Sequence, residues 1–194
     1  MTQQHLAGAG RLIGIDAARA LAFGGMLLAH FATPVRPGEP GWLQVLDNAA
    51  DGRAAPLFCL LLGLGAGILA RRGDRDPVLV KRGLVLFAIG TAVWPYADRV
   101  YLVLPHYGLL LAAVPLLRRL PAQALLAAAG AAFLAPSAIV AVTGAELGRD
   151  RQPDSYAELA ELPTVAYHLL WNGGYPLLGW TGFVLVGLWL ARQP

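Results

Sequence analysis

Long apolar segments dominate this sequence and restrict what it can fold into. The chain is 57% hydrophobic and only 14% charged, with a mean hydropathy of +0.55. This composition is typical of a polytopic membrane protein and not of a soluble domain. A segment of about 20 apolar residues is long enough to cross a bilayer as a helix. We therefore predict an all-α membrane helical bundle, a single transmembrane domain over 1–194, with about six spans near 12–33, 54–70, 78–97, 100–117, 121–143 and 173–191.

The distribution of basic residues predicts the orientation of the bundle. Basic loops stay on the cytoplasmic side of a membrane, so both termini of this multi-pass membrane protein are expected there. The outer loops are then 34–53 and 144–172, in which carboxylates offset the few arginines. The inner segments carry most of the basic residues, namely Arg11, Arg71, Arg72, Arg75, Lys81, Arg82, Arg118, Arg119 and Arg192.

Several classes of site are excluded by composition and motif. The only cysteine, Cys59, lies in an apolar run, so the chain can form neither an intramolecular disulfide nor a paired zinc site, and we expect no metal. The net charge of +3 is small, and no basic face interleaved with aromatic residues predicts nucleic-acid binding. Without a serine elbow or an HExxH motif, any chemistry must rest on histidine, supported by arginine and carboxylate.

The span at about 12–33 contains three ionisable side chains, which are costly inside a bilayer and are functional candidates by default. Arg19 and His30 are eleven residues apart, so both lie on one helix face, about 16 Å apart along the axis. Asp16, three residues before Arg19, is placed to pair with it. This face is a candidate for handling a substrate that reaches across the membrane. The alternative is a structural ion pair and an interfacial histidine.

A second histidine, His106, begins the motif His106-Tyr107-Gly108 near the outer end of the fourth span. It is either a proton shuttle or a hydrogen-bonded core residue. The predicted topology places His30 and His106 at similar depth, so the two histidines are expected to share an outward cavity. Tyr107 and four residues at the outer ends of spans are candidate substrate contacts, with helix capping or a simple turn as the alternative for those four: Asp51, Arg53, Asn172 and Tyr175.

The basic loop between the second and third spans contains Arg71, Arg72, Lys81 and Arg82. Such a cluster sets topology, and it is also suited to bind anionic lipid or the phosphates of a cytoplasmic donor such as coenzyme A. Gly63 and Gly67, inside the second span, have the small-xxx-small spacing that lets two membrane helices approach closely. They therefore predict helix packing and not a nucleotide-binding loop.

The stretch from Arg11 to Arg19, continued to His30, resembles the first membrane helix of the transmembrane acyltransferase superfamily, and the Arg19–His30 spacing is similar to the signature of its acyltransferase-3 branch. Four other features resemble the bacterial heparan-alpha-glucosaminide N-acetyltransferase-like branch: Leu57–Gly65, the basic loop that follows it, Tyr107-Gly108, and Tyr175–Trp180 leading to Gly187 and Arg192.

This resemblance implies transfer of an acyl group from cytoplasmic acyl-coenzyme A (acetyl-coenzyme A) to an extracytoplasmic glycan or similar acceptor. By analogy, His30 is the candidate catalytic residue, Arg19 lines the donor channel and Asp16 holds Arg19. The glucosaminide branch has its key histidine in the first outer loop, and 34–53 contains none. His30 or His106 would therefore take that role.

Two other classes of function fit the same sequence features. The first alternative is a non-catalytic scaffold or partner subunit with the same fold. The second is one half of a proton-coupled transporter, with His30 and His106 on the proton path. Apart from membrane lipid, the partner we expect is a second copy of the chain or another membrane subunit.

Overall fold

The computed structural model describes residues 13–31, 40–43, 45, 52–71, 76–97, 102–143, 160–172 and 175–193. Every regular element in these ranges is a helix, which confirms the predicted all-α class. The chain divides into two compact units, Met1–Ala54 and Ala55–Pro194. The first unit contains the helix α1 (Ile13–Phe31), in which Nη1 of Arg19 lies 3.4 Å from Oδ1 of Asp16. The predicted ion pair within this helix is therefore confirmed.

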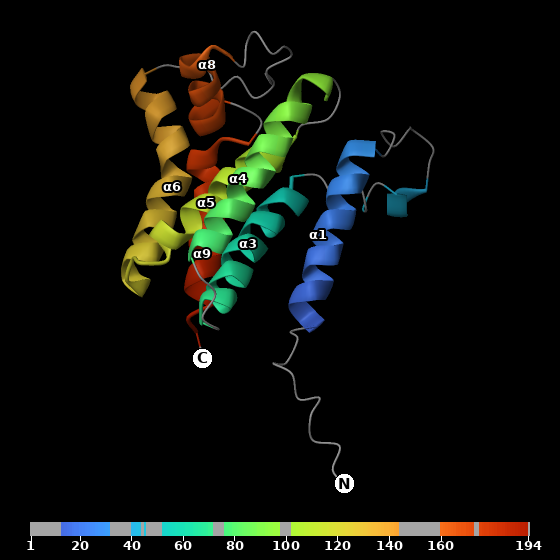
Figure 1. Ribbon diagram of the computed structural model, residues 1–194. Coiled ribbons are helices and arrows are strands. Elements are labelled where there is room, and N and C mark those ends of the chain that lie inside the picture. The colour runs from blue at the N-terminus through green and yellow to red at the C-terminus, as the bar shows by residue number, and fades with distance from the viewer. Residues whose placement is uncertain are drawn as a thin grey trace. The chain divides into compact units, whose positions relative to one another are not determined.

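The second unit is a bundle of helices (Figure 1). A 3₁₀ turn, η1 (Trp94–Tyr96), ends α4 because Pro95 lacks the N–H group that would continue the helix. A π-helical turn, η2 (His168–Asn172), follows α8 directly. The α-helices of this unit are α3 (Ala54–Arg71), α4 (Asp76–Val93), α5 (Leu104–Leu117), α6 (Ala122–Thr143), α8 (Leu162–Tyr167) and α9 (Leu177–Leu190).

Three of the described helical stretches are long and apolar enough to cross a membrane: Ala54–Arg71, Asp76–Tyr96 and Ala122–Val142. Two shorter apolar helices, Leu104–Leu117 and Leu177–Leu190, accompany them. Large apolar side chains remain exposed on α4 and α6, as expected where a helix contacts lipid, among them Leu84, Val85, Ile89, Phe133 and Leu134. Crossing by 12–33, the total of about six spans and the orientation of the termini stay predictions.

The bundle is built from two closely packed helix pairs, α4 with α5 and α6 with α9. The side chains at the centre of its core are almost completely buried, because α5 and α9 both contribute to it and α3 and α6 cover it. The most buried of them are Cys59, Leu79, Val114, Leu125, Val184 and Leu188.

Glycines bring the backbones of α3 and α9 into direct contact. A Cβ atom added to Gly63 would collide with the carbonyl group of Val184, and one added to Gly187 would collide with the carbonyl oxygen of Leu60. Gly67, one turn after Gly63, faces Ala191 in the same way. The small-xxx-small pair predicted from the sequence therefore packs against α9, and this contact brings the last residues of α3 and α9 together.

We expect Gly187→Ala to lower the free energy of unfolding by about 1–3 kcal/mol, because the new methyl group meets backbone atoms that cannot rotate away. Gly130→Ala is the matched control, since nothing lies within 4 Å of the Cβ position at Gly130 on the exposed face of α6. Thermal unfolding of the purified variants in detergent measures the difference. Equal melting temperatures for the two variants would contradict a direct α3–α9 backbone contact.

Candidate functional site

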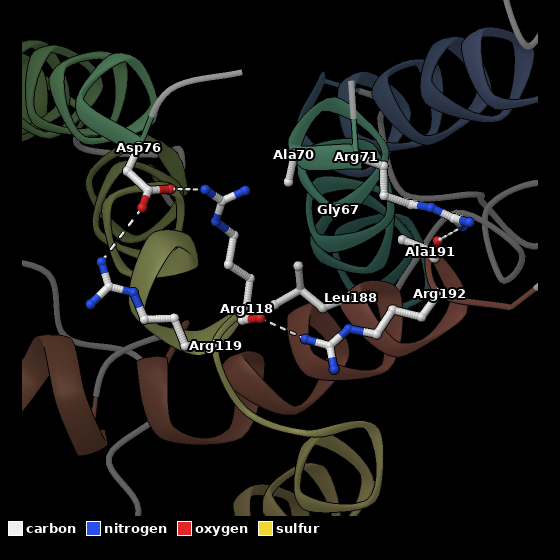
Figure 2. Close-up of a pocket in the computed structure, with 9 residues that line it drawn as sticks. All are labelled: Gly67, Ala70, Arg71, Asp76, Arg118, Arg119, Leu188, Ala191 and Arg192. Carbon is white, nitrogen blue, oxygen red and sulfur yellow. Dashed lines mark hydrogen bonds and ion pairs between the residues drawn. The ribbon is translucent and has the colours of Figure 1, made fainter. Parts of the chain in front are cut away.

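The ends of α3 and α9 and the start of α4 lie at one end of the bundle (Figure 1). Arginines gather at this end. They surround a cavity of about 370 Å³, which we call the arginine pocket (Figure 2). Arg71 is the last residue of α3, Arg118 and Arg119 follow α5, and Arg192 follows α9. The complete lining is Gly67, Ala70, Arg71, Asp76, Arg118, Arg119, Leu188, Ala191 and Arg192.

The apolar part of the pocket consists of small or aliphatic residues from α3 and from the end of α9. Gly67 and Ala70 contribute almost no side chain, and Leu188 and Ala191 face them. Because Gly67 and Ala191 already touch, the helices are held together without filling the space between the arginines. The pocket thus combines an apolar surface with a cationic rim.

Two of the arginines are fixed by backbone carbonyl groups that helix ends leave without an intrahelical partner. Arg71 donates from Nη1 to the carbonyl oxygen of Ala191, at 2.7 Å. Arg192 donates from Nη1 to Leu120 at 2.7 Å and from Nη2 to Arg118 at 2.6 Å, both to carbonyl oxygens. These bonds connect the ends of α3, α5 and α9 and hold the two guanidinium groups in place.

The other two arginines share a single carboxylate. Oδ1 of Asp76 accepts from Nη2 of Arg118, and Oδ2 of Asp76 lies 3.5 Å from Nη2 of Arg119 (Figure 2). Asp76 begins α4, where a negative charge is favoured by the helix dipole. Among the described lining residues, four guanidinium groups therefore face one carboxylate, and the excess of positive charge suits a ligand that carries phosphate groups.

The cofactor residues predicted from the sequence are only partly brought together. Arg71 lines the pocket, whereas Lys81 and Arg82 are exposed further along α4 and do not line it. Arg72 lies outside the described residues, and Arg19 belongs to the other unit. Sequence reasoning did not select the basic residues after the fourth and sixth spans as site residues: Arg118, Arg119 and Arg192. The available signal for a shared site was that all three lie at span ends predicted to face the cytoplasm.

At the opposite end of α5, His106 is 4% exposed, and neither ring nitrogen has a hydrogen-bond partner among the described residues. The nearest polar group that acts on the ring is the backbone of Leu102, in the turn before α5. A neutral imidazole has one donor and one acceptor nitrogen, and each costs about 1–3 kcal/mol when it is buried without a partner. His106 is thus poised to bind a polar group.

Aromatic rings surround His106. The ring centroid of Trp94 lies 5.6 Å away and that of Tyr175 lies 5.9 Å away, both edge to face. Tyr175 also packs against Trp180, at 5.2 Å. The structure therefore brings together two predicted site residues, His106 and Tyr175, and adds Trp94, which sequence reasoning did not select. Tyr107 instead packs on Phe58 of α3, with ring centroids 4.8 Å apart.

The remaining predicted residues are described less fully. His30 lies in α1 and Asn172 ends η2, but the side chains of both are outside the described residues, as is the whole of Asp51. Arg53 is exposed in the turn before α3. His30 and His106 belong to different units. The cavity that the two histidines were expected to share stays a prediction.

We expect His106→Leu to leave the free energy of unfolding unchanged or to raise it by roughly 1 kcal/mol, because the substitution removes two buried polar atoms that have no partner. Leu110→Ala, one turn along α5 and 3% exposed, is the control for a lost core side chain and should cost about 2–5 kcal/mol. Chemical denaturation followed by tryptophan fluorescence measures both. Strong destabilisation by His106→Leu would mean that the histidine is a structural core residue.

The fold and these two sites define a helical membrane protein with a cationic pocket at one end and a buried histidine towards the other. The family model described as "Heparan-alpha-glucosaminide N-acetyltransferase, catalytic" matches residues 11–194, so the chain belongs to this family. The resemblance noted from the sequence is thereby confirmed, and membrane acetyltransferase activity is indicated. Searches of curated proteins and of solved structures gave no match.

Proposed function

We propose that this protein is a membrane-embedded acetyltransferase that takes an acetyl group from cytoplasmic acetyl-coenzyme A and passes it to an extracytoplasmic glycan or similar acceptor. Family membership supports the acetyl transfer, and acetyl-coenzyme A is the donor that the family uses in general. The orientation, with both termini in the cytoplasm of the plasma (inner) membrane, is supported by the basic inner segments.

The arginine pocket is the observation that carries this proposal. Coenzyme A has a 3′-phosphate and a diphosphate on its adenosine end, and guanidinium groups recognise phosphate through paired hydrogen bonds. Four arginines surround one pocket, and Gly67, Ala70, Leu188 and Ala191 offer an apolar surface for the adenine or the pantetheine arm. In the proposed orientation, this end of the bundle faces the cytoplasm, where acetyl-coenzyme A is found.

The second unit also offers a direction for the transfer. Arg118 follows the last residue of α5 and His106 lies in its first turn, about 18 Å apart along the helix at 1.5 Å per residue. With its phosphates among the arginines, the donor would extend its thioester towards His106. The Asp16–Arg19 pair of α1 stays a separate candidate for the donor site, as predicted from the sequence.

The chemistry needs a base. The acceptor hydroxyl or amine attacks the thioester carbonyl carbon, the carbon–sulfur bond breaks, and the coenzyme A thiolate leaves while histidine takes the acceptor proton. Alternatively, histidine carries the acetyl group transiently. We propose His106 for this role, because it is buried and its ring nitrogens have no hydrogen-bond partner among the residues that the structure describes. His30 is the second candidate. Tyr175 beside His106 would position the acceptor, and Asn172, Asp51, Arg53 and Tyr107 are further candidates.

We expect Arg118→Ala and Arg119→Ala each to raise the KM for acetyl-coenzyme A roughly tenfold, with kcat much less affected, because they remove binding to a part of the donor remote from the thioester. Arg119→Lys should recover part of the loss, since the charge remains but the paired donors do not. Gln123→Ala, an exposed change at the start of α6, is the control. Steady-state thioester consumption by purified protein measures these values, and unchanged KM in both alanine variants would remove the pocket as the donor site.

We expect His106→Ala to lower kcat for acetyl transfer about 10²- to 10⁴-fold, the usual contribution of a general base, while acetyl-coenzyme A still binds. His30→Ala tested beside it distinguishes the two candidates. Acetylated acceptor and free thiol are both quantified. Full activity in both variants would exclude histidine catalysis in this chain.

The same assays separate the other classes of function. A non-catalytic partner subunit would form a stable complex with another membrane protein and bind no acetyl-coenzyme A. A transporter half would show pH-dependent uptake in proteoliposomes without consuming thioester.

A further inference from the structure

Asp76 is the one described carboxylate that lines the arginine pocket, and it occupies two of the four guanidinium groups. Its side chain is 30% exposed, that of Arg118 is 24% exposed, and that of Arg119 is 71% exposed. The ion pairs are therefore neither deeply buried nor fully solvated. A charged ligand that enters the pocket can reach both of them.

We infer that Asp76 is an exchangeable counter-ion: it holds Arg118 and Arg119 until a phosphate group of the ligand takes its place, and in this way it selects ligands with two or more phosphate groups. This inference rests on the proposed donor site and adds a residue that sets its selectivity.

The four arginines are held in two different ways. Arg71 and Arg192 donate to backbone carbonyl groups, which belong to helix ends and cannot leave. A guanidinium group has five N–H donors in a planar fork, so donors remain for a ligand. Arg118 and Arg119 instead bind a side chain, which can rotate away. Only the second pair has a partner that a ligand can replace.

A phosphate group competes more strongly for Arg118 and Arg119 than the carboxylate of Asp76 does. A carboxylate brings one negative charge and two acceptor atoms, whereas a phosphate monoester brings a charge of about −1.5 to −2 and three acceptor oxygens. A phosphate can therefore displace Asp76 from Arg118 and Arg119. Any anion that does not displace it is repelled by the carboxylate. A ligand with a single phosphate group binds either the pair Arg71 and Arg192 or the pair that Asp76 holds, but not both pairs. A ligand with two can engage both.

The test uses adenosine 3′,5′-bisphosphate and adenosine 5′-monophosphate as probes, with affinities measured by calorimetry on the purified full chain in detergent. We expect the unmodified protein to bind the bisphosphate at least tenfold more tightly than the monophosphate. Asp76→Asn should tighten binding of the monophosphate roughly threefold to tenfold, the range for losing one partly exposed competing charge. The bisphosphate should gain less, so that the ratio of the two affinities falls.

Two control variants complete the design. Asp76→Glu keeps the carboxylate and should keep the ratio, whereas Glu161→Gln removes an exposed carboxylate at the start of α8 and should change neither affinity. If Asp76→Asn does not fold, Asp76→Ser replaces it, because serine is also favoured at a helix N-terminus and carries no charge.

The results have separate meanings for the two proposals. Failure of the unmodified protein to bind either probe would overturn the arginine pocket as a phosphate site, and with it the proposed donor site. Binding of the bisphosphate, with weaker or unchanged monophosphate affinity after removal of the Asp76 charge, would overturn only the counter-ion role. Asp76 would then be a fixed support for Arg118 and Arg119.

Discussion

The backbone contact between α3 and α9 is the constraint on which the rest of the second unit depends. Gly63 and Gly187 allow the two helices to approach until one backbone meets the other. As a result, Arg71 at the end of α3 reaches the carbonyl of Ala191 at the end of α9. The arginine pocket exists because this contact is made by residues without side chains, which bring two helix ends together and leave the space between them open.

Helix ends have a particular value in an apolar protein. Inside the bilayer, a helix satisfies its own backbone groups, so the last carbonyl groups of each helix are the ones that need outside donors. In the second unit, Arg71 and Arg192 supply those donors and at the same time fix two cationic groups at the rim of a pocket. Towards the other end of α5, in contrast, a buried polar side chain lacks such partners among the described residues. His106 is buried, and neither ring nitrogen has a hydrogen-bond partner in the described part of the chain, a cost that a purely structural core would avoid.

Much of the fold, but less of the site, could be predicted from the sequence. Long apolar segments predicted the all-α class, and the three-residue spacing of Asp16 and Arg19 predicted their ion pair, because both features are local to one helix. Arg71 was selected for its charge and lies in the pocket. Lys81 and Arg82 were selected for the same reason and do not line it. Charge alone does not reveal which way a side chain leaves its helix.

The sequence by itself determined that this chain is a helical membrane protein and that most of its basic residues lie outside the long apolar segments. These conclusions depend on composition and on spacing within one segment. Only the tertiary structure decided that Arg118, Arg119 and Arg192 join Arg71, that Asp76 forms ion pairs with two of these arginines, and that Tyr175 lies beside His106. Contacts of this kind connect residues far apart in the chain, such as Arg71 and Ala191, which are 120 positions apart. These contacts depend on which helices pack together. The sequence does not reveal this, because the apolar pattern of a helix does not identify its neighbour.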